Sequence, residues 1–199
     1  FCMEYYNFKK KLEKKALCKD KVMKNLSDLE RKINSELTTK INGSRIEYNQ
    51  LFLNIDSEDL LDVVLFLKTN KDTKFRQLID ITATDYPEKV KRFKMTYLLL
   101  SHEFNQRIII NYLIHENEIV PTLTKIFPSS NWMEREVFDM YGVKFKDHPD
   151  LRRILTDYGF EGHPLRKDFP LTGHTEVRYS EDQKKVISEP VKLEQNYRN

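Results

Sequence analysis

The sequence predicts an α+β fold, in which a mixed, largely antiparallel sheet is flanked by helices and followed by a long irregular C-terminal extension. Residues 75–84, 93–101 and 107–115 are rich in Ile, Phe, Tyr, Leu and Thr, which favour strands. Short polar connections join them, and such lengths suit antiparallel hairpins better than parallel crossovers. After Gly142 the frequent Gly and Pro predict irregular structure. The predicted regions are an N-terminal helical region at 1–42, an α/β core at 43–142 and a C-terminal arm at 143–199.

The first predicted element is an amphipathic helix over residues 8–37, continuous or broken near residues 19–21. Its apolar residues recur mostly at three- or four-residue steps. Eight lysines lie between residues 9 and 24. A helix packed on the domain with its lysines in solvent is favoured over one that faces a partner or lipid headgroups. The reason is that only part of the lysine face is free of acidic residues.

Between this helix and the three strands we expect one strand and one helix. Residues 45–55 alternate like a strand, and a register shift at their centre predicts a bulge. Asp56 or Ser57 then caps a helix that runs to about residue 69. The expected buried face of this helix consists of Leu60, Leu61, Val63, Val64 and Leu67. After the strands, residues 121–127 predict a short helix that ends before a proline.

Residues 131–141 predict the last long helix. Asn131 is a suitable N-cap, Glu134 completes a capping box, and Gly142 suits a left-handed C-terminal residue. The expected apolar face consists of Trp132, Met133, Val137, Met140 and Tyr141. Within that face Trp132 is interpreted as a packing anchor.

Four charged residues on this helix are candidates for function: Glu134, Arg135, Glu136 and Asp139. Arg135 and Asp139 stand one turn apart and are expected to pair on the surface. Glu134 and Glu136 point to opposite sides of an ideal helix, so they cannot act together as general acid and base. A capped helix with a charged outer face is therefore favoured over catalysis.

In the arm, Asp147, His148 and Asp150 suggest a divalent metal site. His148 lacks the second His or Cys expected of zinc. Asp150 also precedes a short helix expected over residues 151–155, where a carboxylate caps free amides. The cap is favoured over the metal. Residues 175–199 are polar and predict one or two short strands.

Basic and acidic residues alternate in the same arm. Arg152, Arg153, Arg166 and Lys167 are interleaved with Asp157, Glu161 and Asp168. Phosphate binding is disfavoured because the acids nearly balance the bases. Ion pairs that pin an irregular chain, some of them to another protein, are the preferred interpretation.

Composition excludes several functions. The net charge of +3, from 34 basic and 31 acidic residues, disfavours a dedicated nucleic-acid binder. No apolar run approaches the ~20 residues that span a bilayer, so membrane association is expected only through partners. The start lacks a secretory hydrophobic region and the Arg-rich character of an organellar presequence.

Cofactor motifs are missing from the sequence. Two cysteines, Cys2 and Cys18, are too few for an Fe–S cluster, and reduced thiols are favoured over a disulfide. Residues 159–162 lack the Lys and Ser or Thr of a phosphate loop, and no GxGxxG pattern occurs. We therefore expect no NADH, flavin, cluster or metal on this chain and no catalytic residue.

One long run has the character of a family signature. Residues 134–143 read Glu-Arg-Glu-Val-Phe-Asp-Met-Tyr-Gly-Val, and residues 162–170 read Gly-His-Pro-Leu-Arg-Lys-Asp-Phe-Pro. The run resembles the signature of the 30 kDa subunit of respiratory complex I, the proton-pumping NADH:ubiquinone oxidoreductase. Residues 80–87, 128–133 and 176–179 are similar to other parts of that family, so the resemblance covers about residues 45–199.

The resemblance implies a place and partners. It implies a subunit of the hydrophilic arm that contacts chiefly the 49 kDa subunit near the quinone module, with FMN, Fe–S clusters and ubiquinone on neighbouring subunits. It also implies peripheral attachment to the matrix side of the mitochondrial inner membrane or to the cytoplasmic face of a bacterial plasma membrane. The expected partner interface contains Glu134, Arg135, Glu136, Asp139, Asp150, Arg152, Arg153, Asp157, Arg166, Lys167 and Asp168.

Two other classes of function are weighed against this one. The first is the similar subunit of a membrane-bound hydrogenase-type complex, which partner identity and purified activity would distinguish. The second is a stand-alone metal-dependent enzyme using Asp147 and His148, which metal analysis would test.

Overall fold

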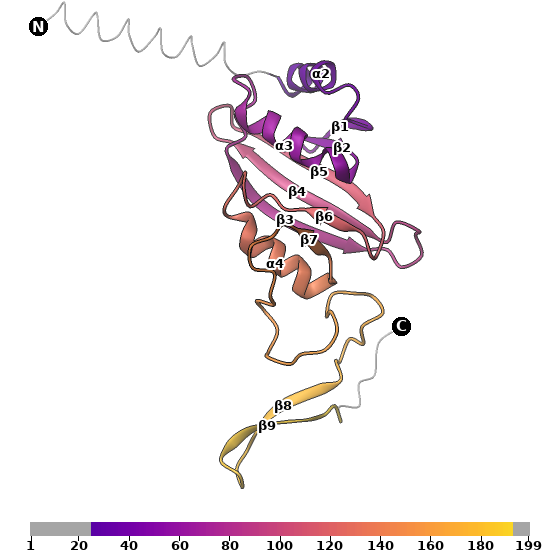
Figure 1. The fold of residues 1–199 in the computed structure, drawn as a ribbon, viewed down its shortest axis with the longest axis vertical. Helices are drawn as coiled ribbons and strands as arrows, with labels where there is room; N and C mark the ends of the chain where they lie inside the picture. The colour runs from indigo at the N-terminus through magenta and orange to yellow at the C-terminus, as the bar shows by residue number, and fades with distance from the viewer. Residues whose placement is uncertain (1–24, 193–199) are drawn as a thin grey trace, which may run out of the picture.

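The computed structural model describes residues 25–192, and a five-stranded sheet forms its centre (Figure 1). The strands of this sheet are β1 (Gly43–Glu47), β2 (Gln50–Asn54), β3 (Gln77–Asp85), β4 (Phe93–Ser101) and β5 (Gln106–Ile114). Their order is β1-β2-β5-β4-β3. Every neighbouring pair is antiparallel except β2 and β5, which run parallel. The α+β class and the largely antiparallel sheet are confirmed.

Helices and two small sheets complete the fold. The helices are α2 (Leu26–Glu36), the 3₁₀ turn η1 (Ser57–Asp59), α3 (Leu60–Thr69) and α4 (Ser130–Tyr141). The short parallel pair is β6 (Ile119–Pro121) with β7 (Lys144–Lys146), and the separate hairpin is β8 (Thr175–Ser180) with β9 (Lys185–Pro190). Figure 1 shows α4 beside β3, and it shows the β8–β9 hairpin projecting from the body at the end opposite α2. No helix within residues 25–192 is both long and apolar enough to cross a membrane.

The helices pack on one face of the sheet. The alternating buried side chains of β4, such as Met95, Tyr97 and Leu99, lie on this face. α2 adds Leu29 and Ile33 to the same apolar core. The opposite face carries half-exposed side chains, so the body has two layers.

Residues 43–54 differ from the expected bulged strand. Tyr48 and Asn49 both have positive φ, 50° and 58°, as in the two-residue turn of a tight hairpin. β1 and β2 therefore pair with each other, with Glu47 opposite Gln50. The shift in hydrophobic register marked a reversal of the chain, because a turn and a bulge both interrupt alternation.

Three helix predictions need correction. Residues 121–127 form no helix, because Pro121 ends β6 and only a single turn closes from Leu123 to Phe127. Residues 151–155 are also irregular. In α3, Leu60, Val63, Val64 and Leu67 are buried as expected, but Leu61 is exposed. The expected helix at 8–37 is present as α2 from residue 26, and its first part lies outside the described residues, as do both cysteines.

Candidate partner interface

The carboxylate of Asp139 on α4 holds the start of the arm. It accepts hydrogen bonds from the backbone N–H groups of Ile154, Leu155 and Thr156 at 3.0, 2.8 and 2.9 Å. The Thr156 hydroxyl donates at 2.7 Å, and Arg153 Nη1 donates at 2.8 Å. Asp139 is fully buried, so the expected surface pair with Arg135 is wrong.

This set of donors fixes the charge of Asp139. Burial alone would raise the pKa of the carboxyl, because it disfavours the charged form. The bonds from Thr156, Leu155 and Arg153 outweigh burial and hold the pKa well below its usual range. Asp139 is therefore an ionised acceptor for a stretch of chain that has no strand or helix partner.

Arg135 supports the same stretch from the next face of α4. Its Nε donates to the carbonyl of Arg152 at 3.0 Å, and its Nη2 donates to the carbonyl of Arg153 at 3.1 Å. Arg152 itself points away and pairs with Asp150 at 2.8 Å on the surface. Asp150 thus caps no helix.

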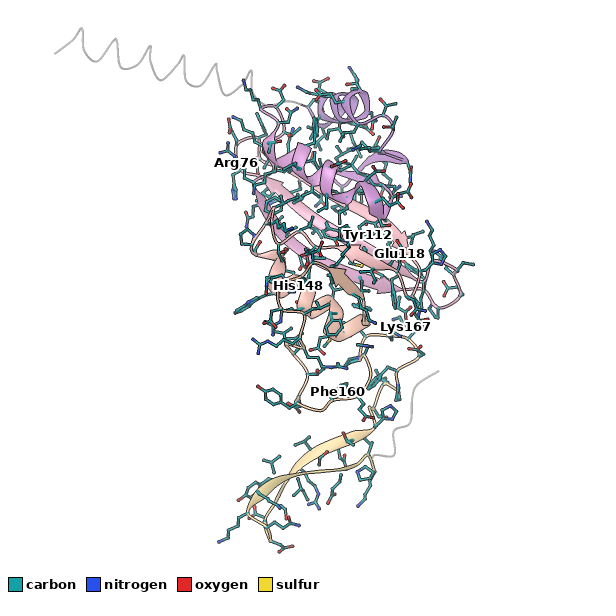
Figure 2. All side chains as sticks on the ribbon, in the orientation of Figure 1. Arg76, Tyr112, Glu118, His148, Phe160 and Lys167 are labelled. Carbon is teal, nitrogen blue, oxygen red and sulfur yellow. The ribbon has the colours of Figure 1, made fainter. Side chains whose placement is uncertain are left out.

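A second anchor joins the arm to the β3–β4 connection. The buried carboxylate of Asp85 accepts from Arg92 at 2.7 and 2.9 Å and from the backbone N–H of Lys167 at 2.8 Å. Arg92 also pairs with Asp168 at 2.9 Å. The bond from Arg92 lowers the pKa of Asp85, and the same bond raises the pKa of Arg92. The side chain of Lys167 is exposed (Figure 2).

The end of α4 is shaped to receive the arm. Gly142 has φ +80° and is the left-handed C-cap that the sequence predicts. A Cβ atom there would lie 2.6 Å from His163 Nε2 and 2.7 Å from Arg166 Nη2. Arg166 donates to the carbonyl of Tyr141 at 2.6 Å and to Glu116 at 2.7 Å. A glycine therefore both ends the helix and admits the returning chain.

Glu134 is buried on the inner side of α4 and closes no capping box. It accepts from Leu123 N at 2.7 Å and from the Thr122 hydroxyl at 2.5 Å. Ser129, which makes no side-chain cap bond, takes the N-cap position. Burial raises the pKa of Glu134, although these bonds oppose the shift. Glu134 therefore fixes the segment after β6, where the sequence had predicted a helix.

His148 lies next to Glu134, with Nε2 3.9 Å from Oε2. Its Nδ1 accepts from the backbone N–H of Asp150 at 3.1 Å, and Nε2 lies 3.1 Å from the carbonyl of Asn131. The proton is therefore assigned to Nε2. Both ring nitrogens are engaged, so His148 offers no free nitrogen to a metal. Within residues 25–192 no group of three or more His, Cys, Asp and Glu side chains could hold a metal ion.

The outer side of α4 carries an apolar groove of about 620 Å³. Pro128, Ser129, Trp132, Met133, Glu136, Ile154 and Leu155 line it. Trp132 is 71% exposed and Leu155 is 60% exposed, so Trp132 is no internal packing anchor. Further exposed apolar side chains follow along the arm and hairpin: Tyr158, Leu165, Leu171, Val177, Tyr179 and Val186.

The predicted site residues thus fall into two groups. Glu134, Arg135, Asp139, Arg153, Arg166 and Asp168 bind other parts of this chain. Glu136, Asp150, Arg152, Asp157 and Lys167 have exposed side chains. Sequence reasoning missed Asp85, Arg92 and Glu116. Asp85 and Arg92 are a carboxylate and a guanidinium on either side of a hairpin connection. That spacing alone could have predicted that they pair.

A similar fold also occurs in a respiratory assembly. The fold is similar to a chain of the membrane-bound sulfane sulfur reductase, an archaeal respiratory membrane complex, with a TM-score of 0.65. The match covers 74% of this chain and 87% of that chain at 21% identity.

Residues 53–175 match the family model described as respiratory-chain NADH dehydrogenase, 30 Kd subunit, and the chain belongs to this family. It is similar to bacterial proteins named as the C subunit of NADH-quinone oxidoreductase. The relative from Mesorhizobium japonicum is 48% identical over 87% of each chain. The relative from Ruegeria pomeroyi is 50% identical over 87% of this chain and 88% of its own, and that from Cereibacter sphaeroides is 53% identical over 78% of each.

Proposed function

We propose that this chain is a non-catalytic subunit of the hydrophilic arm of proton-pumping NADH:quinone oxidoreductase, where it braces the 49 kDa subunit near the quinone module. The observation that carries the proposal is the exposed groove around Trp132 and Leu155, next to an arm that the chain itself holds in place. Exposed aromatic anchors of this kind dominate protein interfaces. The identity of the bacterial relatives supports this complex as the assembly.

The division of labour within the chain follows from the anchors. We propose that residues 1–42 and 43–142 form the supporting body and that residues 143–199 present the contact surface. The exposed charged residues Glu136, Arg152 and Lys167 would form the polar rim around the apolar groove. FMN, Fe–S clusters and quinone would lie on neighbouring subunits, and the chain would reach the membrane only through them.

The membrane to which the complex belongs depends on whether the chain is bacterial or mitochondrial. The relatives favour the cytoplasmic face of a bacterial plasma membrane, whereas the high content of Lys, Asn and Ile fits an AT-rich organellar genome and the matrix side of the mitochondrial inner membrane. In either case the proposed attachment is peripheral.

A hydrogenase-type membrane complex is the second candidate. The fold shared with a chain of the sulfane sulfur reductase is compatible with both candidates, because it shows only that this fold occurs in another respiratory membrane complex. That likeness is 21% in sequence, against about half for the NADH-quinone oxidoreductase relatives. Identification of co-purifying subunits separates the two, because only one assembly contains an NADH-oxidising subunit.

The test is replacement of Trp132 by Ala in the organism's own complex. We expect assembled complex to fall at least tenfold, since truncation of a central aromatic anchor costs about 2 kcal/mol or more. Turnover per assembled complex should stay near normal. The matched control is Tyr48→Asn, which removes an even more exposed aromatic ring at the β1–β2 turn and introduces a residue that tolerates positive φ. Full assembly with reduced turnover in Trp132→Ala would contradict the bracing role.

A further inference from the structure

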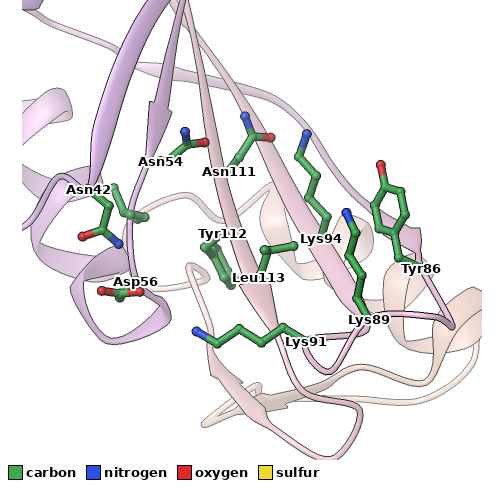
Figure 3. A pocket seen from close by; sticks show the side chains of 11 residues that line it. Asn42, Asn54, Asp56, Tyr86, Lys89, Lys91, Lys94, Asn111, Tyr112 and Leu113 are labelled. Atoms are coloured by element: carbon green, nitrogen blue, oxygen red, sulfur yellow. The ribbon is translucent and has the colours of Figure 1, made fainter.

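A second pocket, of about 500 Å³, opens on the sheet face opposite α4. Its walls come from the end of β2, the end of β5, the start of β4 and the β3–β4 connection (Figure 3). Phe93, beside Lys94 on β4, packs edge-on against Tyr141 of α4, so Lys94 points to the other face. The pocket is therefore separate from the groove around Trp132, and a ligand bound there is independent of the proposed function.

The charge of this pocket is unbalanced. Lys89, Lys91 and Lys94 line it, against the single carboxylate of Asp56. None of the three lysines pairs with a carboxylate among residues 25–192. Elsewhere lysines do pair, as Lys40 does with Asp62 and Lys74 with Glu103. A concave surface lined by one sign of charge concentrates the opposite sign.

The connection that carries two of these lysines is fixed by the chain. Tyr86 N donates to the Arg92 carbonyl at 2.9 Å, and Lys89 N donates to the Tyr86 carbonyl at 3.0 Å. His115 Nδ1 lies 3.1 Å from the carbonyl of Val90, which ties the loop to the end of β5. Arg92 is held by Asp85 from the other face. Lys89 and Lys91 thus stand on a positioned loop and Lys94 stands on a strand, so ligand binding would require little ordering of the backbone.

Neutral hydrogen-bonding groups surround the lysines. The carboxamides of Asn42, Asn54 and Asn111 line the pocket. Asn111 is almost fully buried, and its Oδ1 accepts from Thr96 at 2.9 Å. That bond assigns the Asn111 amide nitrogen as a donor. Figure 3 shows Lys91 reaching across the pocket in the direction of Asp56, while Lys89 and Lys94 extend on the side of Tyr86.

The position in the sheet also suits a ligand. Asn54 ends β2, and residues 111–114 end β5, so the pocket lies at the carboxyl ends of the one parallel pair in the five-stranded sheet. Ligands of open α/β sheets bind outside the carboxyl ends of parallel strands. The volume lies in the range of small-molecule sites.

We propose that this pocket binds a phosphate ester of nucleotide size. The three ammonium groups and the Asn111 amide would bind phosphate oxygens. Asp56, on the opposite wall, would accept a hydrogen bond from a hydroxyl group of the ligand. The same chemistry is offered by a free phosphorylated metabolite and by a phospholipid headgroup.

The experiment is an NMR titration of the ¹⁵N-labelled full chain with ADP. Backbone amides of Asn54, Lys94 and Asn111 should shift at millimolar ADP, and rising salt should reverse the shifts. Lys91→Gln/Lys94→Gln should weaken binding about tenfold or more, because two charges are removed. The control Lys71→Gln/Lys144→Gln removes two exposed lysines elsewhere and should leave binding unchanged.

Two further probes decide the chemical class and its source. Citrate should bind at least about tenfold more weakly than ADP if phosphate is recognised. Vesicles of phosphatidylglycerol and phosphatidylcholine that bind with the same dependence on Lys91 and Lys94 would assign the phosphate to a lipid headgroup. No shift of the pocket amides by ADP or vesicles, equal weakening in the control, or equal binding of citrate would each overturn the proposal. The salt titration of the unchanged chain decides the matter even if a variant fails to fold.

Discussion

The sheet and the arm of this protein are ordered by different interactions. In the sheet, backbone groups bond to neighbouring strands, and side chains such as Leu99 and Ile108 are fully buried. In the arm, residues 154–156 and 167 have no strand partner, and their N–H groups bond to the buried carboxylates of Asp139 and Asp85. A few ionised acceptors can thus fix a chain that regular structure leaves free. The two regions should respond differently to mutation and pH.

The largest effect is expected from the sheet. Leu99→Ala removes a fully buried side chain and should lower the free energy of unfolding by about 2–5 kcal/mol. Urea denaturation followed by circular dichroism measures it. Leu113→Ala, on the exposed face of β5, is the control and should change stability far less. Equal losses in both variants would mean that the apolar layer does not dominate the stability of the body.

Asp139→Asn should act on the arm and spare the sheet. Hydrogen bonds to a charged group contribute about 1.5–3 kcal/mol, and this carboxylate accepts several. Hydrogen exchange should show lost protection at residues 154–156, with β4 and β5 still protected. Asp157→Asn changes an exposed neighbour in the same arm and should leave exchange unaltered. Unchanged protection in Asp139→Asn would show that the arm is ordered by something else.

Gly142→Ala tests the space that the arm needs at the end of α4. A left-handed non-glycine residue costs about 1–2 kcal/mol. At Gly142 the added Cβ would also displace His163 and Arg166. Gly159→Ala is matched, because its φ of +78° is similar and nothing lies within 4 Å of the added atom. The difference in thermal stability between the two variants measures the effect of the close contact. Equal losses would mean that the contact does not affect stability.

The smallest expected effect is that of pH on two carboxylates. The lowered pKa of Asp139 gives stability that is present above an ordinary carboxyl pKa of about 4 and is lost as pH falls through the folded value. The raised pKa of Glu134 acts in the opposite sense, because stability declines as pH rises from about 4.3 through its folded value. As pH rises, the free energy of unfolding of Glu134→Gln should therefore increase relative to that of the unchanged chain, by under about 1 kcal/mol.

Urea midpoints at a series of pH values follow this difference. A gain that is the same at every pH would mean that Glu134 ionises without cost in the folded protein.

The sequence predicted the parts of the fold that depend on local pattern. The strands β3, β4 and β5, the helix α3 and the C-cap at Gly142 follow from alternation, periodicity and glycine chemistry. The β8–β9 hairpin also matches the one or two strands expected in the polar tail.

Long-range polar contacts could not be predicted in this way. The spacing of Glu134 is compatible with a capping box. In the fold the side chain is buried and instead accepts a hydrogen bond from Leu123 N. The spacing of Asp139 is also compatible with a surface pair with Arg135. The arm packs across α4 in the fold, and Arg153 becomes the partner of Asp139. Trp132 is apolar by type but exposed in this chain, and under the proposed function a neighbouring subunit would cover it. Local spacing leaves such choices open, since the energies of the alternatives differ only once distant segments meet.

The two carboxylate anchors close loops of very different length. Asp139 and the backbone N–H of Thr156 are 17 residues apart in sequence, whereas Asp85 and Lys167 are 82 apart. The entropy lost on closing a loop grows with its length, and the longer loop here also requires β3 and β4 to be in register. During synthesis the Asp139 anchor can therefore form as soon as α4 and the next twenty or so residues have left the ribosome. The Asp85 anchor can form only after β3 and β4 have paired in the sheet.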